Sequence, residues 1–99
     1  IVVLQCLSEG DRYGYELLTI IQERSDGYYA LKEGSLYPVL YRLEEKKYID
    51  HYQKIYSEER RVPRKYYRLT FEGAEALSRM KQAWEIHKNA TDQILGDSG

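Results

Sequence analysis

The chain has 99 residues and a formal net charge of −1 at pH 7, with 15 basic and 16 acidic side chains. A domain of this size buries only about 60–65% of the surface that its unfolded chain exposes, so a partner would add stability. No stretch approaches the roughly 18 apolar residues of a membrane span. The single cysteine, Cys6, excludes an intrachain disulfide and a cysteine-rich zinc site.

Cys6 and the N-terminus bear on where the protein works. Cys6 lies among Val3, Leu4 and Leu7, so we expect a buried, reduced thiol, as in a cytoplasmic protein. The chain begins at Ile1, without methionine and without a basic and apolar signal segment. We therefore expect that further residues precede Ile1 in the complete protein.

The N-terminal part of the chain predicts two helices separated by a turn. Residues 1–7 are mostly apolar and fit the end of a helix, whereas Gly10 and Asp11 interrupt the pattern and indicate a turn over residues 8–14. Residues 15–25 then carry apolar side chains at helical spacing. A glycine follows them, as it often does where a helix ends.

Residues 33–47 predict a third helix with one apolar face. The apolar residues that fall on this face, at a spacing of 3.6, are Leu36, Val39, Leu40 and Leu43. Pro38 fits if the helix starts near Ser35, where the first N–H groups have no helical partner in any case. An earlier start would make Pro38 kink the helix, with Gly34 relieving the clash, and the sequence leaves both starts open.

Residues 48–56 and 64–70 predict a β-hairpin. Both segments are rich in tyrosine or isoleucine, and the polar loop between them suits a hairpin tip. Alternation along the strands separates two sets of residues. We expect Ile49, Tyr67 and Leu69 to face the core, and Tyr66 and Arg68 to face outward.

Thr70 and Glu72 predict the start of a last, long helix. Thr70 fits the N-cap position, and Glu72 in the first turn favours the helix dipole. Residues spaced alternately by three and four positions form a narrow seam along this helix. They are Leu77, Met80, Trp84, His87, Thr91 and Ile94. A narrow seam on a terminal helix is typical of packing against another helix. In so short a chain we expect that helix to come from a second subunit.

This order of elements predicts an α+β fold, mostly α: a winged helix-turn-helix of three helices and a two-stranded wing over residues 1–70. A dimerisation helix follows over residues 71–99. In such a fold the third helix enters the DNA major groove. The residues expected to contact DNA are Ser35, Tyr37, Tyr41 and Arg42. Alternatively, Arg42 lies on a solvated helix face beside the two acids that follow it.

The positive charge of the chain gathers in the loop and returning strand of the hairpin. Residues 60–68 carry five basic side chains and no acid, so the rest of the chain sums to −6 (−1 minus +5). We expect the wing residues Arg60, Arg61, Arg64 and Lys65 to bind DNA phosphates or to enter the minor groove. The alternative is a solvated run of charge that balances Glu58 and Glu59.

Three segments of the chain resemble the PadR family of bacterial winged-helix transcriptional regulators. They are "YGYELL" (13–18), "GSLYPVLYRLEEKKYI" (34–49) and "RKYYRLTFEGAEAL" (65–77), and together they span most of the chain in the right order. The sequence departs from the family at Lys47, where glycine is frequent. It also departs at the wing tip, "RRVPRK" (60–65), where a Gly-Arg-Pro-like turn is usual.

The resemblance implies a homodimeric DNA-binding regulator, typically a repressor of a nearby operon. Family members dimerise through the C-terminal helix. In the short, multidrug-sensing branch, an aromatic residue of that helix lines a pocket for flat apolar ligands at the dimer interface. Trp84 falls at the matching position, as such a ligand contact or simply as an anchor of the interface.

We therefore predict a cytoplasmic homodimer that binds a pseudo-palindromic operator, with recognition helices about 34 Å apart. A small aromatic ligand at the dimer interface could release it. The alternative is a winged-helix adaptor that binds another protein, for which a basic wing has no purpose. We expect no enzyme, cofactor or metal site, because no catalytic set is visible and neither His51 nor His87 has a carboxylate or cysteine at ligand spacing.

Overall fold

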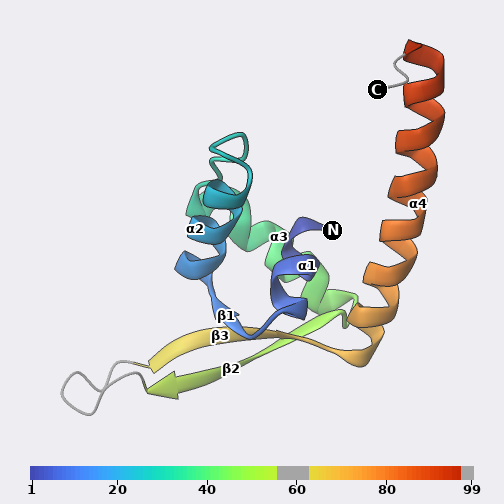
Figure 1. The fold of residues 1–99 in the computed structure, drawn as a ribbon. Helices are drawn as coiled ribbons and strands as arrows, with labels where there is room; N and C mark the ends of the chain where they lie inside the picture. The colour runs from blue at the N-terminus through green and yellow to red at the C-terminus, as the bar shows by residue number, and fades with distance from the viewer. Residues whose placement is uncertain (56–62, 97–99) are drawn as a thin grey trace.

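The computed structural model describes residues 1–55 and 63–96. This part of the chain contains four helices and three strands, joined by turns and loops (Figure 1). In chain order they are α1 (Val2–Ser8), β1 (Arg12–Tyr13), α2 (Gly14–Arg24), α3 (Glu33–Glu45), β2 (Ile49–Ile55), β3 (Pro63–Leu69) and α4 (Phe71–Leu95). This order confirms the predicted α+β winged helix-turn-helix with a long C-terminal helix. Within the described residues, no helix has the length and apolar character needed to cross a membrane.

β1 is a strand that the sequence pattern did not predict. The turn expected over residues 8–14 includes Arg12 and Tyr13, which pair antiparallel with Tyr67 and Tyr66 of β3. The sheet therefore has three strands in the order β1-β3-β2, where the sequence predicted a two-stranded wing. A strand of two residues is too short to show an alternating pattern, so its pairing with β3 identifies it.

α3 takes the earlier of the two starts that the sequence left open. The helix begins at Glu33, with Lys32 as its N-cap residue, so that Pro38 lies inside the helix. Because proline has no N–H, Pro38 cannot donate the usual bond to the Gly34 carbonyl. The apolar face predicted for this helix is nevertheless packed, as Leu36 is fully buried.

α3 ends in a reversal of the chain with Lys47 in the left-handed conformation. The Tyr48 amide donates to the Leu43 carbonyl and the Lys47 amide to the Glu44 carbonyl, at 3.0 and 2.9 Å. These are the two bonds of a Schellman motif, in which the left-handed residue is usually glycine. Lys47 has a φ of +64°. A side chain therefore stands where the backbone favours glycine, at one of the two departures from the PadR pattern.

The register of the hairpin agrees with the predicted inward and outward residues. β2 and β3 pair antiparallel, with Ile49 opposite Leu69. Ile49 and Tyr67 are 1% and 2% exposed, and Leu69 packs partly buried against the core. Alternation places Tyr66 and Arg68 on the opposite face of the sheet.

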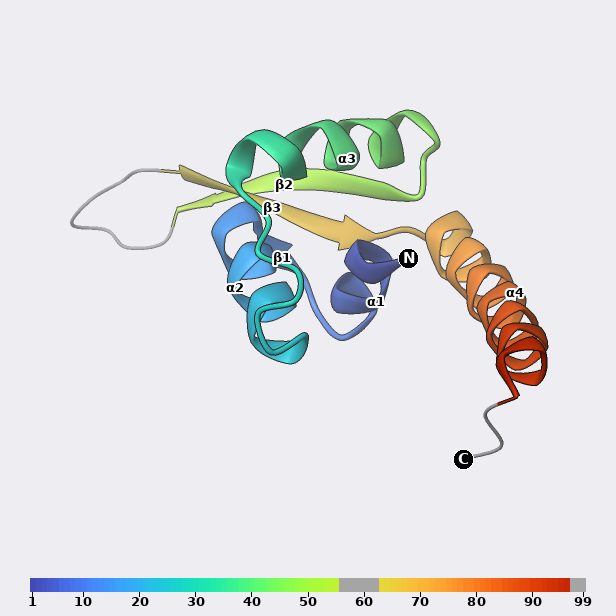
Figure 2. The same cartoon turned by 90° about the horizontal axis from the view of Figure 1, so that it is seen from above.

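The core lies between the sheet and the helices on one of its faces. Figure 1 shows α1, α2 and α3 on the same side of the sheet, and Figure 2 shows α3 running beside β2. The largest fully buried side chains come from α1, α2, α3, β2 and β3, and they are Leu4, Leu17, Leu36, Leu40, Ile49 and Tyr67. In the described residues, no helix covers the other face of the sheet.

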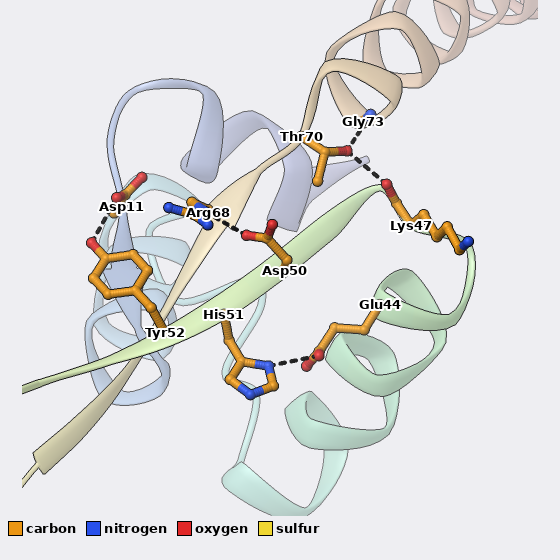
Figure 3. Close-up of polar contacts among 9 residues, drawn as sticks. All are labelled: Asp11, Glu44, Lys47, Asp50, His51, Tyr52, Arg68, Thr70 and Gly73. Carbon is orange, nitrogen blue, oxygen red and sulfur yellow. Dashed lines mark hydrogen bonds and ion pairs between the residues drawn. The ribbon is translucent and has the colours of Figure 1, made fainter.

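Thr70 joins the start of α4 to the loop after α3, as the predicted N-cap. Its Oγ1 accepts a hydrogen bond from the Gly73 amide at 3.0 Å and donates one to the Lys47 carbonyl at 2.6 Å (Figure 3). The Thr70 amide donates to the Tyr48 carbonyl at 3.0 Å. Gly73 packs so closely that a Cβ there would overlap this same carbonyl oxygen. Glu72 lies in the first turn, as predicted.

α4 changes from buried to exposed along its length. Gly73, Ala76 and Leu77 are buried, and Met80 is partly buried against the same core. Every residue in 81–90 is exposed. Figure 1 shows the helix extending away from the rest of the molecule.

Candidate DNA-binding surface

The α3 residues predicted to contact DNA all lie on its exposed face. They are Ser35, Tyr37, Tyr41 and Arg42. Tyr37 and Tyr41 are 45% and 65% exposed. With Leu36 and Leu40 anchoring the opposite face in the core, α3 holds hydroxyl and guanidinium groups toward the solvent on a rigid support.

A groove of about 430 Å³ connects the start of α3 with the wing. Its lining comes from α2, α3, β1 and β3, and the residues are Tyr13, Gly14, Tyr15, Glu33, Tyr37, Arg64, Lys65 and Tyr67. The Tyr37 hydroxyl lies so close to Gly14 that a Cβ at Gly14 would be 2.7 Å from it. The groove thus joins Tyr37 of α3 to two of the predicted wing cations, Arg64 and Lys65, whereas Ser35, Tyr41 and Arg42 are not among its lining residues.

The groove is suited to an anionic backbone. Helix α2 begins at Gly14 and α3 at Glu33, so the positive ends of two helix dipoles lie at the groove together with two cationic side chains. Glu33 is the one acidic residue among its lining residues. Tyr13 and Tyr15 supply further hydroxyls. Sequence reasoning did not select these tyrosines as contacts, although the "YGY" segment that contains them contributed to the PadR resemblance.

The wing cations divide between the two faces of β3. Lys65 follows Arg64 directly, so their side chains leave the strand on opposite sides. The Lys65 ammonium lies 5.4 Å from the centre of the Tyr67 ring on the α3 side, and the Arg64 guanidinium lies 4.5 Å from the Tyr13 ring on the other. Arg60 and Arg61, the other predicted wing residues, lie outside the described residues.

The face of the sheet without a helix is covered by its own tyrosines and cations. The Tyr66 ring packs edge-on to Tyr13 at 5.5 Å and stacks on Tyr52 at 5.8 Å. The Tyr52 hydroxyl donates to Asp11 at 2.7 Å, which raises the pKa of Tyr52 (Figure 3). The Arg68 guanidinium lies 5.3 Å from the Tyr52 ring. These contacts support a hairpin that would otherwise be a thin, solvated ribbon.

Arg68 is held by an acid on the same face of the hairpin. Its Nε donates to Asp50 Oδ1 at 2.6 Å, and this bond raises the pKa of Arg68 (Figure 3). Both side chains are about half exposed, so we expect the pair to contribute little to the free energy of unfolding. Its effect is to hold the guanidinium over the tyrosines of the sheet.

The predicted seam on α4 divides into two parts. Leu77 is 6% exposed and Met80 packs beside it, so both contribute to the core of their own chain, where the sequence predicted contacts with a second subunit. Beyond them, Trp84 and Ile94 are 54% and 84% exposed. His87 is exposed with its ring 5.9 Å from that of Trp84, and Thr91 is partly exposed.

Trp84 lines an open cleft of about 770 Å³ between α4 and the first two helices. Its lining includes Ile1, Val2, Ile21 and Tyr29. Buried Cys6 also reaches this cleft, and burial raises the pKa of its thiol. In residues 1–55 and 63–96, no three histidine, cysteine or acidic side chains gather as a metal site would require.

The family follows from comparison with known proteins. The profile of the transcriptional regulator PadR-like family matches residues 3–79 of this chain, from α1 into α4. The chain belongs to the PadR family. It is also 37% identical to an uncharacterized protein of Lysinibacillus sphaericus over 94 residues. This match covers 95% of this chain and 84% of that protein.

Solved structures of PadR-like and other transcriptional regulators have the same fold. A PadR family regulator from Clostridium difficile is 37% identical with a TM-score of 0.79, covering 95% of this chain and 94% of that one. A PadR-like regulator from Bacillus cereus is 32% identical with a TM-score of 0.79, covering 98% and 88%. A regulator from Clostridium thermocellum is 36% identical with a TM-score of 0.82, covering 93% and 87%. These likenesses confirm the resemblance found in the sequence and the winged-helix fold.

Proposed function

We propose that this PadR family protein is a sequence-specific DNA-binding repressor that acts as a homodimer on a pseudo-palindromic operator. The observation that carries the proposal is the groove in which Tyr37 of the recognition helix meets Lys65 and Arg64 of the wing. A recognition helix and a basic hairpin beside it are the parts with which a winged helix-turn-helix contacts a duplex.

The exposed side chains of α3 and the wing divide the work of recognition. Arg42, which is exposed on α3, would read guanine through O6 and N7, a contact that contributes about 1–3 kcal/mol of discrimination. The hydroxyls of Ser35, Tyr37 and Tyr41 donate hydrogen bonds to phosphates or base edges. Lys65 and Arg64, with Arg60 and Arg61 beyond the described residues, neutralise phosphates and supply affinity without sequence information.

The exposed half of α4 supports a homodimer. Its large apolar side chains are solvated in the single chain, with Trp84 and Ile94 at 54% and 84% exposure, and such exposed residues are typical of association surfaces. The intersubunit seam that we infer consists of Trp84, His87, Thr91 and Ile94. Two chains joined in this way would place their α3 helices in successive major grooves, about 34 Å apart.

The cleft beside Trp84 supports release by a small aromatic ligand. A flat ring stacked on Trp84 would lie between α4 and the α1–α2 pair, because residues of all three helices line the cleft. It would thereby change the angle between the dimerisation helix and the DNA-binding elements. If no compound in a screen of flat aromatic molecules changes operator affinity, this part of the proposal is wrong.

Fluorescence anisotropy tests the DNA-binding proposal. The probe is a labelled duplex from the region upstream of the gene, compared with a random duplex at two salt concentrations. We expect a preference of about 10³ or more for the upstream duplex, with affinity falling steeply as salt rises. Weak and equal binding to both duplexes would contradict an operator in this region.

Matched variants separate DNA binding from a protein-adaptor role. Replacing Arg60, Arg61 and Arg64 with alanine should weaken binding to all duplexes and reduce its salt dependence. Arg42→Ala should reduce the preference for the upstream duplex while leaving the salt dependence nearly unchanged. An adaptor would keep its function in all of these variants.

A further inference from the structure

An ion pair joins the recognition helix to the root of the wing. Nδ1 of His51, in β2, lies 2.7 Å from Oε2 of Glu44, in the last turn of α3 (Figure 3). The side chains are 41% and 25% exposed, so the pair is partly shielded from water. The sequence showed no carboxylate at ligand spacing from His51. Glu44 is seven positions away, and the turn between α3 and β2 brings it into contact.

The chemistry of the two groups assigns the proton. A carboxylate oxygen only accepts hydrogen bonds, so His51 Nδ1 is the donor. In a neutral imidazole the other nitrogen then accepts, whereas the protonated ring has a second N–H and a full positive charge. Hydrogen bonds between charged partners are roughly twice as strong as neutral ones. The protonated form of an imidazole is favoured as the pH falls.

Among the described residues, Glu44 is the acidic side chain that pairs with His51. From β3, Tyr67 faces His51 with ring centres 6.1 Å apart, and the Lys65 ammonium lies 5.4 Å from the same Tyr67 ring. From its own strand, the neutral Gln53 follows two positions on, on the same face. A neutral His51 therefore leaves the charge of Glu44 unbalanced on the helix that we propose enters the major groove.

We propose that His51 and Glu44 form a pH-dependent latch that positions the wing on the recognition helix and tightens DNA binding as the pH falls. The inference rests on the proposed DNA-binding function. Two effects act in the same direction. Protonation strengthens the hydrogen bond between the two groups and so holds the root of the wing more firmly against α3, and less conformational entropy is then lost on binding. Protonation also balances the Glu44 carboxylate, which otherwise repels phosphates.

The chain offers a matched control in Glu45, an exposed acid that follows Glu44 on the same helix, whereas His51 pairs with Glu44. Operator affinity is measured by anisotropy from pH 5.5 to 8.0 at constant ionic strength, for the wild type and for His51→Gln, Glu44→Gln and Glu45→Gln. We expect the wild type to bind about fivefold more tightly at pH 5.5 than at pH 8.0, the size of one partly shielded ion pair. Glu45→Gln should keep this dependence and His51→Gln should lose most of it.

Glu44→Gln distinguishes the latch from the alternative that protonated His51 contacts DNA phosphates directly, without Glu44. With the latch, this variant binds more tightly than the wild type at pH 8.0 and shows a much smaller pH dependence. An unchanged pH dependence in Glu44→Gln would mean that His51 acts on phosphates without its partner, and the latch would be wrong. An unchanged dependence in His51→Gln would assign the titration to other groups, with the same consequence.

A measurement without DNA keeps this inference separate from the proposed function. The loss in melting temperature caused by His51→Gln should be larger at pH 5.5 than at pH 8.0, and this difference should vanish when Glu44 is already glutamine. A loss that does not depend on pH would overturn the ion pair itself. If the loss follows the pH as expected but the wild type binds no DNA at any pH, the proposed function fails and the pair has only a structural role.

Discussion

The two halves of α4 show how one regular helix can serve two different purposes. Its first turns bury Gly73, Ala76 and Leu77 in the core of the winged helix, while all side chains in 81–90 are exposed. Both halves carry apolar residues at the same heptad spacing. The pattern therefore indicates that a helix packs on something, and the position of the rest of the chain decides what each half packs on.

The largest effect is expected where α4 passes closest to its own chain. Gly73→Ala would place a methyl group on the Tyr48 carbonyl oxygen, and we expect a loss of about 3 kcal/mol in the free energy of unfolding. Chemical denaturation measures it. Gly34→Ala is the control, since a Cβ at Gly34 meets nothing within 4 Å. Similar losses in the two variants would contradict the close packing of α4.

A pair of truncations compares the two halves of α4 directly. Leu77→Ala should lower the free energy of unfolding of the monomer by about 2–4 kcal/mol, because it leaves a cavity in the core. Trp84→Ala should weaken dimerisation by about 2–4 kcal/mol and leave the monomer nearly as stable. Denaturation at low protein concentration and sedimentation equilibrium separate these quantities. A dimer that survives Trp84→Ala unchanged would place the subunit contact elsewhere.

The junction before α4 should show a smaller effect. Thr70→Ala removes the cap of the Gly73 amide and the bond to the Lys47 carbonyl, so we expect a loss of about 1–2 kcal/mol in the free energy of unfolding. Ser78→Ala, on an exposed position of α4, should change it by less than about 0.5 kcal/mol. Thermal denaturation of both variants tests the difference, and equal melting temperatures would exclude the cap as a contributor.

The smallest expected effect is a gain in stability. Lys47→Gly should raise the free energy of unfolding by about 0.5–1 kcal/mol, because Lys47 holds a φ of +64° that glycine adopts without steric cost. Lys46, the preceding residue, has a φ of −79°. Lys46→Gly should therefore be neutral or destabilising. A loss of stability in Lys47→Gly would mean that the lysine side chain makes a contribution larger than its backbone strain.

Much of the fold could be predicted because its signals are local. Apolar periodicity identified α2, α3 and α4, alternation identified the inward residues of the hairpin, and Thr70 marked the start of the last helix. The segments with PadR-like motifs indicated the family, and the comparisons confirm it. The DNA contacts proposed on α3 were selected in the same way, as the polar face of an amphipathic helix, and they lie exposed.

What the sequence by itself determined is therefore the four helices, the two strands of the hairpin, their order and the family. The tertiary structure decided which distant residues meet, and these pairings have no fixed spacing along the chain. It placed Arg12 and Tyr13 in a third strand and Glu44 beside His51. It also assigned Leu77 to the core of its own chain. Local patterns indicate whether a side chain is to be buried or paired. Which residue it then contacts depends on how the elements pack, because burial of apolar surface is non-directional.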